Sequence, residues 1–97
     1  MENLVLLARL EAKPGKEQEV AEFIKSALAL AQQEAGTIRW YALQIGPSVF
    51  GIFDTFADED GRQAHLNGPI AAALMAKAEE LLSLPPQIET VTLLAVK

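Results

Sequence analysis

The pattern of apolar and polar residues divides the chain into strand-like and helix-like stretches. Four stretches are rich in β-compatible residues: residues 3–11, 37–45, 49–56 and 87–96. Turn-forming Pro or Gly residues lie near each of them, and Gly46-Pro47-Ser48 separates the second stretch from the third. The pattern predicts four β-strands, of which the second and third form a hairpin.

Another stretch repeats apolar residues every three or four positions, which is the period of an amphipathic helix. Its apolar positions are Val20, Phe23, Ile24, Ala27, Leu28 and Ala31. The stretch begins at Lys16, and Gly36 provides a stop signal at its C-terminal side. We therefore expect a helix of about five turns.

A second helical stretch covers residues 58–84 and opens with the acidic run Asp58-Glu59-Asp60. Acidic residues at this position favour a helix N-terminus, and Asp58 and Thr55 are the candidate caps. Asn67-Gly68-Pro69 interrupts the stretch, and Pro85-Pro86 ends it. We expect the helix to kink or restart at the interruption.

The order of these elements is βαββαβ. In the split βαβ arrangement this order places both helices on one face of a four-stranded antiparallel sheet. We therefore predict an α+β fold of the ferredoxin-like type. A chain of 97 residues is the size of one domain, so residues 1–97 are expected to form a single domain.

The first and third predicted strands are apolar on both faces. In the first, Leu4, Leu6, Ala8 and Leu10 alternate with Val5 and Leu7, and in the third, Val49 and Phe53 alternate with Phe50, Ile52 and Phe56. Because two helices cover only one face of the sheet, the second apolar face predicts a homodimer joined through its sheet faces. The alternative is a partly solvent-exposed face, since protein surfaces are more than half apolar.

Composition and charge exclude several classes of protein. The chain has no cysteine, which excludes disulfides, thiolate catalysis and thiolate metal sites. Thirteen acidic and eight basic residues give a net charge of −5 without a basic cluster, so we expect no nucleic-acid partner. There is no long apolar run and no basic signal-peptide start, so we expect a soluble cytoplasmic protein that does not enter a membrane.

Several short motifs follow one another in a characteristic order. They are Lys13-Pro14-Gly15-Lys16, Ala35-Gly36-Thr37, Asp54-Thr55-Phe56-Ala57-Asp58, Ala64-His65-Leu66-Asn67-Gly68-Pro69 and the segment 82–86. Together they resemble the antibiotic biosynthesis monooxygenase family of the dimeric α/β-barrel superfamily. The resemblance implies a monooxygenase that oxidises a small aromatic or quinol-type substrate with dioxygen and uses no metal or organic cofactor. Such a reaction needs an apolar cavity, a base and groups that orient a planar substrate.

His65 is the only histidine in the chain and the candidate catalytic residue. Its ordinary pKa makes it the one side chain here that accepts a proton near pH 7 without a large shift. The family motif also has a histidine at this place in the second helix. The alternative is a structural histidine that packs near the break in that helix.

Trp40 and Tyr41 are candidate substrate contacts in the second strand. Adjacent strand residues point to opposite faces, so only one of them lines a given pocket. Trp40 is the better cavity candidate if its face of the strand meets the helices, and packing is the alternative role for both rings. Phe53, next to Asp54 in the third strand, is a further candidate substrate contact.

Asp54 and Asn67 complete the candidate site. Asp54 lies in an otherwise apolar strand, where burial would raise its pKa towards that of a working base. We favour instead an ion pair with Arg39 on the neighbouring strand. Asn67 precedes a glycine and is first of all a turn residue, although its amide is also a candidate substrate contact.

Other functions on the same fold remain open. Haem degradation in similar proteins relies on an asparagine, a tryptophan and a histidine, but Asn3 and Trp40 stand at different places in this sequence, so haem is disfavoured. The remaining alternatives are a non-catalytic dimeric protein that binds a small ligand and an isomerase-type enzyme.

Overall fold

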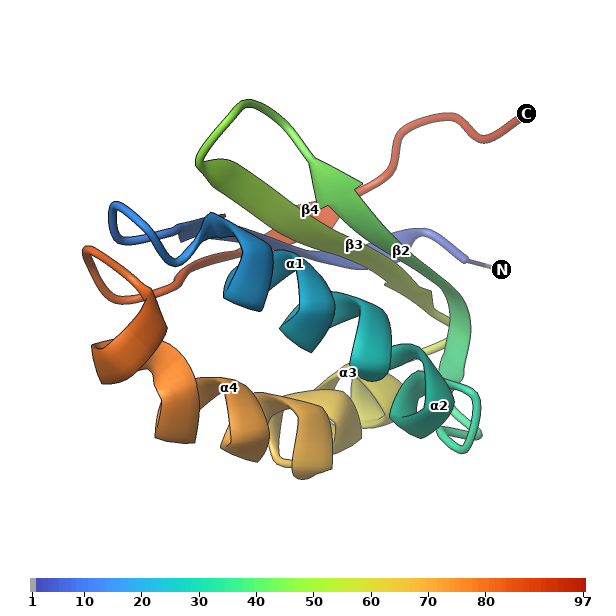
Figure 1. The fold of residues 1–97 in the computed structure, drawn as a ribbon. Helices are drawn as coiled ribbons and strands as arrows, with labels where there is room; N and C mark the ends of the chain where they lie inside the picture. Colours follow the sequence, from blue (N-terminus) through green and yellow to red (C-terminus); the bar gives the residue numbers. More distant parts are fainter. Residues whose placement is uncertain (1) are drawn as a thin grey trace.

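A computed structural model describes residues 2–97 of the chain (Figure 1). Its elements are β1 (Leu4–Glu11), α1 (Glu17–Ser26), α2 (Leu28–Ala31), β2 (Thr37–Gln44), β3 (Val49–Phe56), α3 (Glu59–Leu66), α4 (Pro69–Leu81) and β4 (Gln87–Thr92). If α1 with α2, and α3 with α4, are each taken as one interrupted helix, the order is βαββαβ. The predicted order is confirmed.

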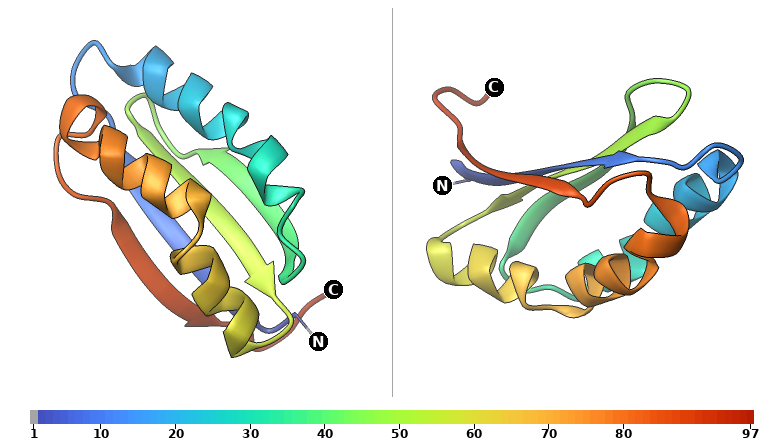
Figure 2. Two further views of the ribbon diagram at one scale, coloured as in Figure 1. Left: turned by 90° about the horizontal axis from the view of Figure 1, so that it is seen from below. Right: turned by 90° about the vertical axis from the view of Figure 1, so that its left-hand side faces the viewer.

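The four strands form one antiparallel sheet in the order β2-β3-β1-β4. All helices lie on one face of the sheet, and the other face is left without a helix (Figures 1 and 2). The sheet remains open, with β2 and β4 at its edges. This is the predicted ferredoxin-like α+β fold.

Both helical stretches are divided into two segments. The first is interrupted at Ala27, whose amide bonds to the carbonyls of Phe23 and Ile24, and it ends at Ala31 instead of near Gly36. The second restarts at Pro69, as the sequence predicts, because proline is well suited to the first position of a helix. Residues between Ala31 and β2 therefore form a loop, which supplies one group of the site described below.

The last strand is shorter than expected, because β4 ends at Thr92 rather than at Val96. The amide of Leu93 still bonds to the carbonyl of Asn3 at 2.7 Å. Beyond that point the side chain of Leu94 is 97% exposed. Apolar composition alone overextended the predicted strand, since β1, its neighbour in the sheet, begins only at Leu4.

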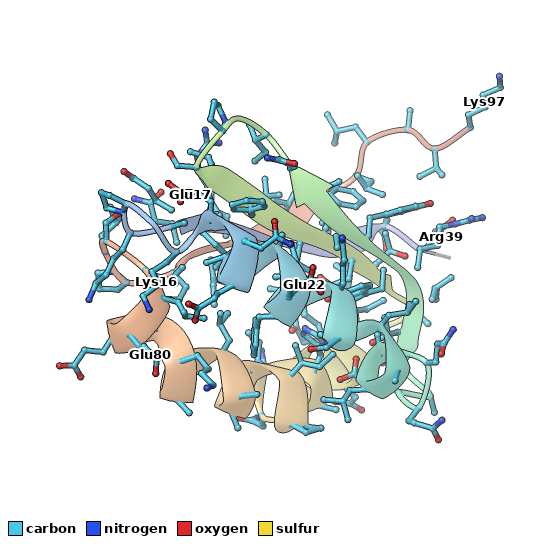
Figure 3. The ribbon with its side chains drawn as sticks, viewed as in Figure 1. Lys16, Glu17, Glu22, Arg39, Glu80 and Lys97 are labelled. Atoms are coloured by element: carbon cyan, nitrogen blue, oxygen red, sulfur yellow. The ribbon has the colours of Figure 1, made fainter. Side chains whose placement is uncertain are left out.

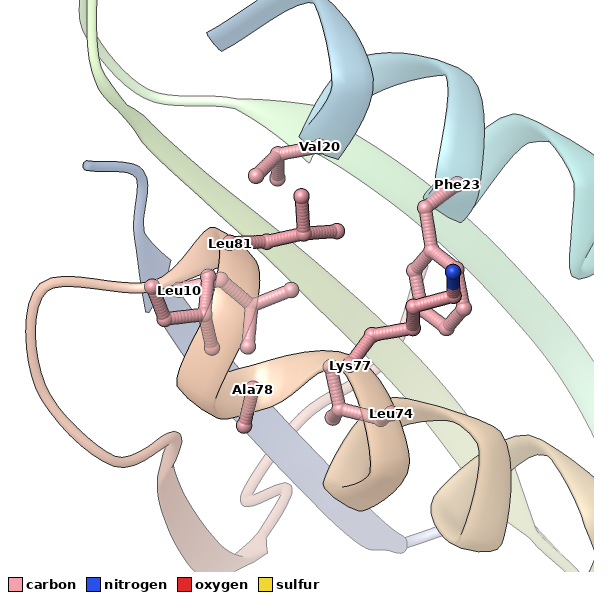
Figure 4. Close-up of a pocket in the computed structure, with 8 residues that line it drawn as sticks. Leu10, Val20, Phe23, Leu74, Lys77, Ala78 and Leu81 are labelled. Atoms are coloured by element: carbon pink, nitrogen blue, oxygen red, sulfur yellow. The ribbon is translucent and has the colours of Figure 1, made fainter. Parts of the chain in front are cut away.

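The main core lies between the helices and the helix-facing side of the sheet. Its buried residues are Ala8, Leu10, Ala12, Val20, Ile24, Phe50, Ile52, Leu74, Leu81 and Leu82. Where α1 and α4 meet over β1, only a cavity of about 10 Å³ remains, between Leu10, Phe23 and Leu74 among others (Figure 4). This end of the molecule is packed with apolar side chains.

The helix-free face of the sheet carries several apolar side chains at alternating positions. Tyr41 is 47% exposed, and its ring centroid lies 6.2 Å from that of Phe53. Leu7 pairs in register with Phe53, and Leu43 lies nearby on β2. We call Leu7, Tyr41, Leu43 and Phe53 the open-face patch. Among residues 2–97, no helix is long and apolar enough to cross a membrane.

Candidate functional site

His65 lies near the C-terminal end of α3 and points towards the sheet. Asp58 caps this helix through a 2.8 Å hydrogen bond that its Oδ1 accepts from the amide of Gly61. His65 is only 8% exposed, and its ring centroid lies 5.4 Å from that of Phe56. The sole histidine is therefore buried between α3 and β3 instead of lying on the surface of the helix.

Each nitrogen of the His65 ring faces a carboxylate. Nδ1 lies 2.7 Å from Oε1 of Glu34, which comes from the loop before β2. Nε2 lies 3.0 Å from Oδ2 of Asp54, which is 1% exposed and comes from β3. The second contact has the length of an ion pair but not the alignment of a hydrogen bond. We call Glu34, Asp54 and His65 the buried cluster.

One contact orients the side chain of Glu34, and another brings its loop close to α3. The hydroxyl of Thr37, at the start of β2, donates to Oε1 of Glu34 at 2.8 Å. Gly36 approaches Gly61 so closely that a Cβ on Gly36 would lie 2.7 Å from the Cα of Gly61. Only residues without a Cβ allow this approach, so two glycines bring the loop that carries Glu34 to the helix that carries His65.

The charges of the cluster shift the pKa values of its members. Burial lowers the pKa of His65, but Asp54 and Glu34 outweigh this effect and raise it to about 9. Burial raises the pKa of Asp54, although the contact with His65 acts in the opposite direction. At neutral pH the imidazole is therefore a cation with a proton on each nitrogen, and it has no free position at which to accept another proton.

Three buried side-chain atoms of residues 2–97 have no hydrogen-bond partner, and two of them belong to the cluster. They are Oε2 of Glu34, Oδ2 of Asp54 and Nε1 of Trp40. Unsatisfied buried polar atoms are uncommon and costly, so two of them in one cluster indicate a place for a bound molecule or water.

Two hollows border these atoms. A cavity of about 30 Å³ lies on the Asp54 and His65 side and is otherwise lined mainly by apolar residues of β1, β3, β4, α3 and α4. A surface groove of about 280 Å³ lies on the other side, between α2 and β2, and is lined by Glu34 and Trp40 among others. The Glu34–His65 contact therefore lies between the two hollows.

The structure separates the candidate aromatic residues. Trp40 faces the helices and packs against Ala27, Ala31 and Ile70, as expected for the cavity candidate. Tyr41 and Phe53 lie on the helix-free face, because adjacent strand residues alternate and Tyr41 pairs in register with Phe53. These two rings therefore do not belong to the His65 site.

The ion pair expected between Asp54 and Arg39 is wrong. Asp54 contacts His65 on the helix-facing side, whereas Nε of Arg39 bonds to Oε1 of Glu2 at 2.8 Å. Arg39 points away from the helices (Figure 3), because it lies in register with Thr55 and so on the opposite face from Asp54. Strand alternation forbids the expected pair.

The side chain of Asn67 forms a hydrogen bond at the C-terminal end of α3. Its side-chain amide donates to the carbonyl of Gln63 at 3.0 Å, and the residue is exposed. This contact matches the turn role expected from the sequence.

Sequence reasoning missed Glu34. It lies in a polar loop, and no local motif distinguishes it from the other acidic residues. The one available signal was its position directly before Ala35-Gly36-Thr37. The contact with His65, 31 positions further along, arises only from the tertiary fold.

The fold and the site together define a ferredoxin-like α+β protein with a buried carboxylate–imidazole–carboxylate cluster between its helices and its sheet. A family model described as antibiotic biosynthesis monooxygenase matches residues 3–77. The chain belongs to this family. No match was found among curated protein sequences.

Solved structures support the assignment of the fold. A protein of unknown function from Nitrosomonas europaea is 65% identical, with a TM-score of 0.97 over 100% of this chain and 94% of its own. A Pseudomonas aeruginosa protein is 22% identical, with a TM-score of 0.83 over 98% of this chain and 97% of its own. A Mycobacterium tuberculosis protein is 15% identical, with a TM-score of 0.84 over 96% of each chain. The last two similarities concern the fold alone.

Proposed function

We propose that this protein is a cofactor-independent monooxygenase that oxidises a small electron-rich aromatic or quinol-type substrate with dioxygen. Membership of the family supports this class of reaction. The observation that carries the proposal is the buried cluster, in which two carboxylates flank one imidazole and each retains an oxygen without a hydrogen-bond partner. The carboxylate oxygens of such a cluster are able to accept a proton.

The proton acceptor in this proposal is a carboxylate and not the imidazole. His65 already carries protons on both nitrogens at neutral pH, since its pKa is raised to about 9. Oε2 of Glu34 has no hydrogen-bond partner, and Oδ2 of Asp54 lies 3.0 Å from Nε2 of His65 without a hydrogen bond, so a carboxylate oxygen of the cluster receives the substrate proton in this proposal. Burial raises the pKa of Asp54, which makes it a better base than an exposed aspartate. The imidazolium stabilises negative charge that develops next to it.

The chemistry itself belongs to the substrate. Once it is deprotonated, an electron-rich ring passes an electron to dioxygen, and the two radicals combine to a hydroperoxide. For an anthrone-like substrate, loss of water from that intermediate converts the ring CH₂ group into a carbonyl, so one oxygen atom enters the product and the other leaves as water. The protein contributes proton transfer, orientation and exclusion of bulk water.

Oxygen uptake by the metal-free protein tests this proposal. We would supply a panel of quinols and anthrone-like phenols and subtract the autoxidation of each substrate. We expect uptake that depends on the protein and falls at least tenfold in Asp54→Asn, with Glu80→Gln on the surface of α4 as the control. If no substrate is consumed above background, the monooxygenase proposal fails.

A second candidate, a non-catalytic protein that binds a small ligand, is favoured by the small size of the cavity next to Asp54 and His65. At about 30 Å³ it holds a water-sized molecule, whereas a cavity that binds benzene measures about 150 Å³. Saturable ligand binding without oxygen uptake would support this alternative.

We also propose that the protein forms a homodimer through its open-face patch. On a single chain Tyr41 is exposed and the other three residues of the patch are only half-buried, and an apolar sheet face of this kind fits a second copy of itself. Phe53→Asp places a charge in the patch, and we expect it to shift sedimentation from dimer to monomer. Met75→Asp, on the exposed side of α4, is the matched control. A wild-type protein that sediments as a monomer at micromolar concentration would contradict this proposal.

A further inference from the structure

The cavity next to Asp54 and His65 reaches the surface on one side. Most of its lining residues are buried, Asp54 and His65 among them. The exceptions are Leu66 of α3, Ala71 of α4 and Ile88 of β4. Leu66 and Ala71 are half-buried, whereas Ile88 is 44% exposed. The mouth of the cavity therefore lies between β4 and the two helices α3 and α4.

Ile88 is exposed because none of the helices in residues 2–97 covers β4. It pairs in register with Ala8, a core residue of β1, so it lies on the helix-facing side of the sheet. Figure 2 shows β4 at the edge of the sheet, beside α3 and α4 rather than beneath them. Thr90 and Thr92, the next residues on the same side of β4, are also exposed. Ile88 therefore borders the cavity without belonging to the packed core.

The polar groups of the cavity lie at its inner end. Among residues 2–97, Asp54 and His65 are the only polar residues that line it, and both nitrogens of His65 already face carboxylates. The carboxylate of Asp54 accepts more than one hydrogen bond, and its Oδ2 has no hydrogen-bond partner. A water molecule needs two to four polar partners, whereas the hydroxyl of an aromatic ring can donate to a single acceptor. The lining therefore suits a phenol or quinol better than water.

We propose that the substrate ring enters between β4 and the helices α3 and α4 and places its hydroxyl on Asp54, and that Ile88 limits the size of the ring. Two strand spacings, roughly 10 Å, separate β3 from β4, so a ring that crosses β1 extends from Asp54 towards Ile88. The cavity of about 30 Å³ does not hold a whole ring, so the outer part of the ring contacts Ile88 at the mouth. The inference rests on the proposed function for the base and the reaction, and it adds Ile88 as the residue that selects the substrate.

The chain offers a matched control for Ile88 in Ile38. Both residues are isoleucines of the edge strands, and they are 44% and 47% exposed. Ile38 does not line the cavity next to Asp54. Ile88→Ala widens the mouth of the cavity, and Ile88→Trp fills it. The same two changes at Ile38 alter an edge strand and leave the mouth as it is.

Binding is measured without oxygen, so that no turnover interferes. We would titrate hydroquinone, or 1,4-dihydroxynaphthalene with its additional fused ring, into the full chain and follow the ring signals of His65, the only histidine, by NMR. We expect the wild-type protein to favour hydroquinone. Ile88→Ala should shift the ratio of the two affinities at least tenfold towards the larger compound, and Ile88→Trp should weaken both at least tenfold. Ile38→Ala and Ile38→Trp should leave both affinities unchanged.

The outcomes distinguish this inference from the proposed function. The absence of a saturable shift of the His65 signals, or equal effects of the Ile88 and Ile38 variants, would overturn the entrance at Ile88. A change of preference that follows Ile88, without oxygen uptake by any variant, would leave the entrance in place and overturn the monooxygenase. Oxygen uptake with the same substrate range in the wild type, Ile88→Ala and Ile88→Trp would do the opposite.

Discussion

Because the pKa of His65 is raised, we expect the protein to become less stable as the pH rises into the alkaline range. In the unfolded chain the imidazole titrates near its ordinary value of 6.5, whereas in the folded protein its pKa is about 9. Between these two values the folded state binds one proton more than the unfolded state. The free energy of unfolding therefore falls as the pH rises through this window, and the full contribution of His65 is present only below about pH 6.5.

The size of the effect follows from the width of that window. One pH unit corresponds to 1.36 kcal/mol, so the interval from 6.5 to about 9 corresponds to about 3 kcal/mol. The side chain of His65 is only 9% exposed, so solvent screens the interaction little. Asp54 affects the free energy of unfolding over a different pH range, because its raised pKa favours the folded state only at acidic pH.

Urea denaturation followed by circular dichroism measures this dependence directly. We expect the free energy of unfolding to fall by about 3 kcal/mol between pH 6.5 and 9.5, and the NMR signal of the single imidazole to titrate near pH 9. His65→Gln should remove the slope in this window, since it has no group that titrates there. A wild-type stability that stays constant from pH 6.5 to 9.5 would refute the ion-pair assignment of the cluster.

Three substitutions test the local structure around the site, each by urea denaturation. Gly61→Ala should cost about 2 kcal/mol, because a Cβ there lies 2.9 Å from the carbonyl oxygen of Gly36, whereas Gly46→Ala meets no atom within 4 Å and should be nearly neutral; equal costs would contradict the close approach. Asp58→Ala removes the cap of α3 and should cost about 1 kcal/mol with a loss of helical signal. Leu10→Ala opens a cavity at a fully buried position and should cost about 3 kcal/mol; a cost below 1 kcal/mol would place Leu10 outside the core.

The fold was accessible from the sequence because its signals are local and repeated. Apolar alternation defined the strands, the three-and-four spacing defined the helices, and proline and glycine defined most of their ends. Two of the departures have simple causes. The end of β4 depends on its neighbour in the sheet, and the break at Ala27 has no glycine or proline to announce it.

The site was only partly accessible, because its members come from distant parts of the chain. The rule of strand alternation correctly placed Trp40 and Tyr41 on opposite faces, and the structure shows that Trp40 is on the helix-facing one. The pairing of the two strands, which places Arg39 opposite Thr55, excludes the pair of Asp54 with Arg39. No comparable rule predicts the contact of Glu34 with His65 from the sequence. It depends on the meeting of Gly36 and Gly61, which is a tertiary event.

The role of His65 changes because of what surrounds it. As a residue type, histidine suggests a base near pH 7, and this was the expectation from the sequence. A second carboxylate reverses that role, since an imidazole held between Glu34 and Asp54 keeps its proton until the pH reaches about 9. The cluster can then take up one further proton only on a carboxylate oxygen. The acidic residues around a histidine therefore decide whether it acts as the base or as the cation that positions one.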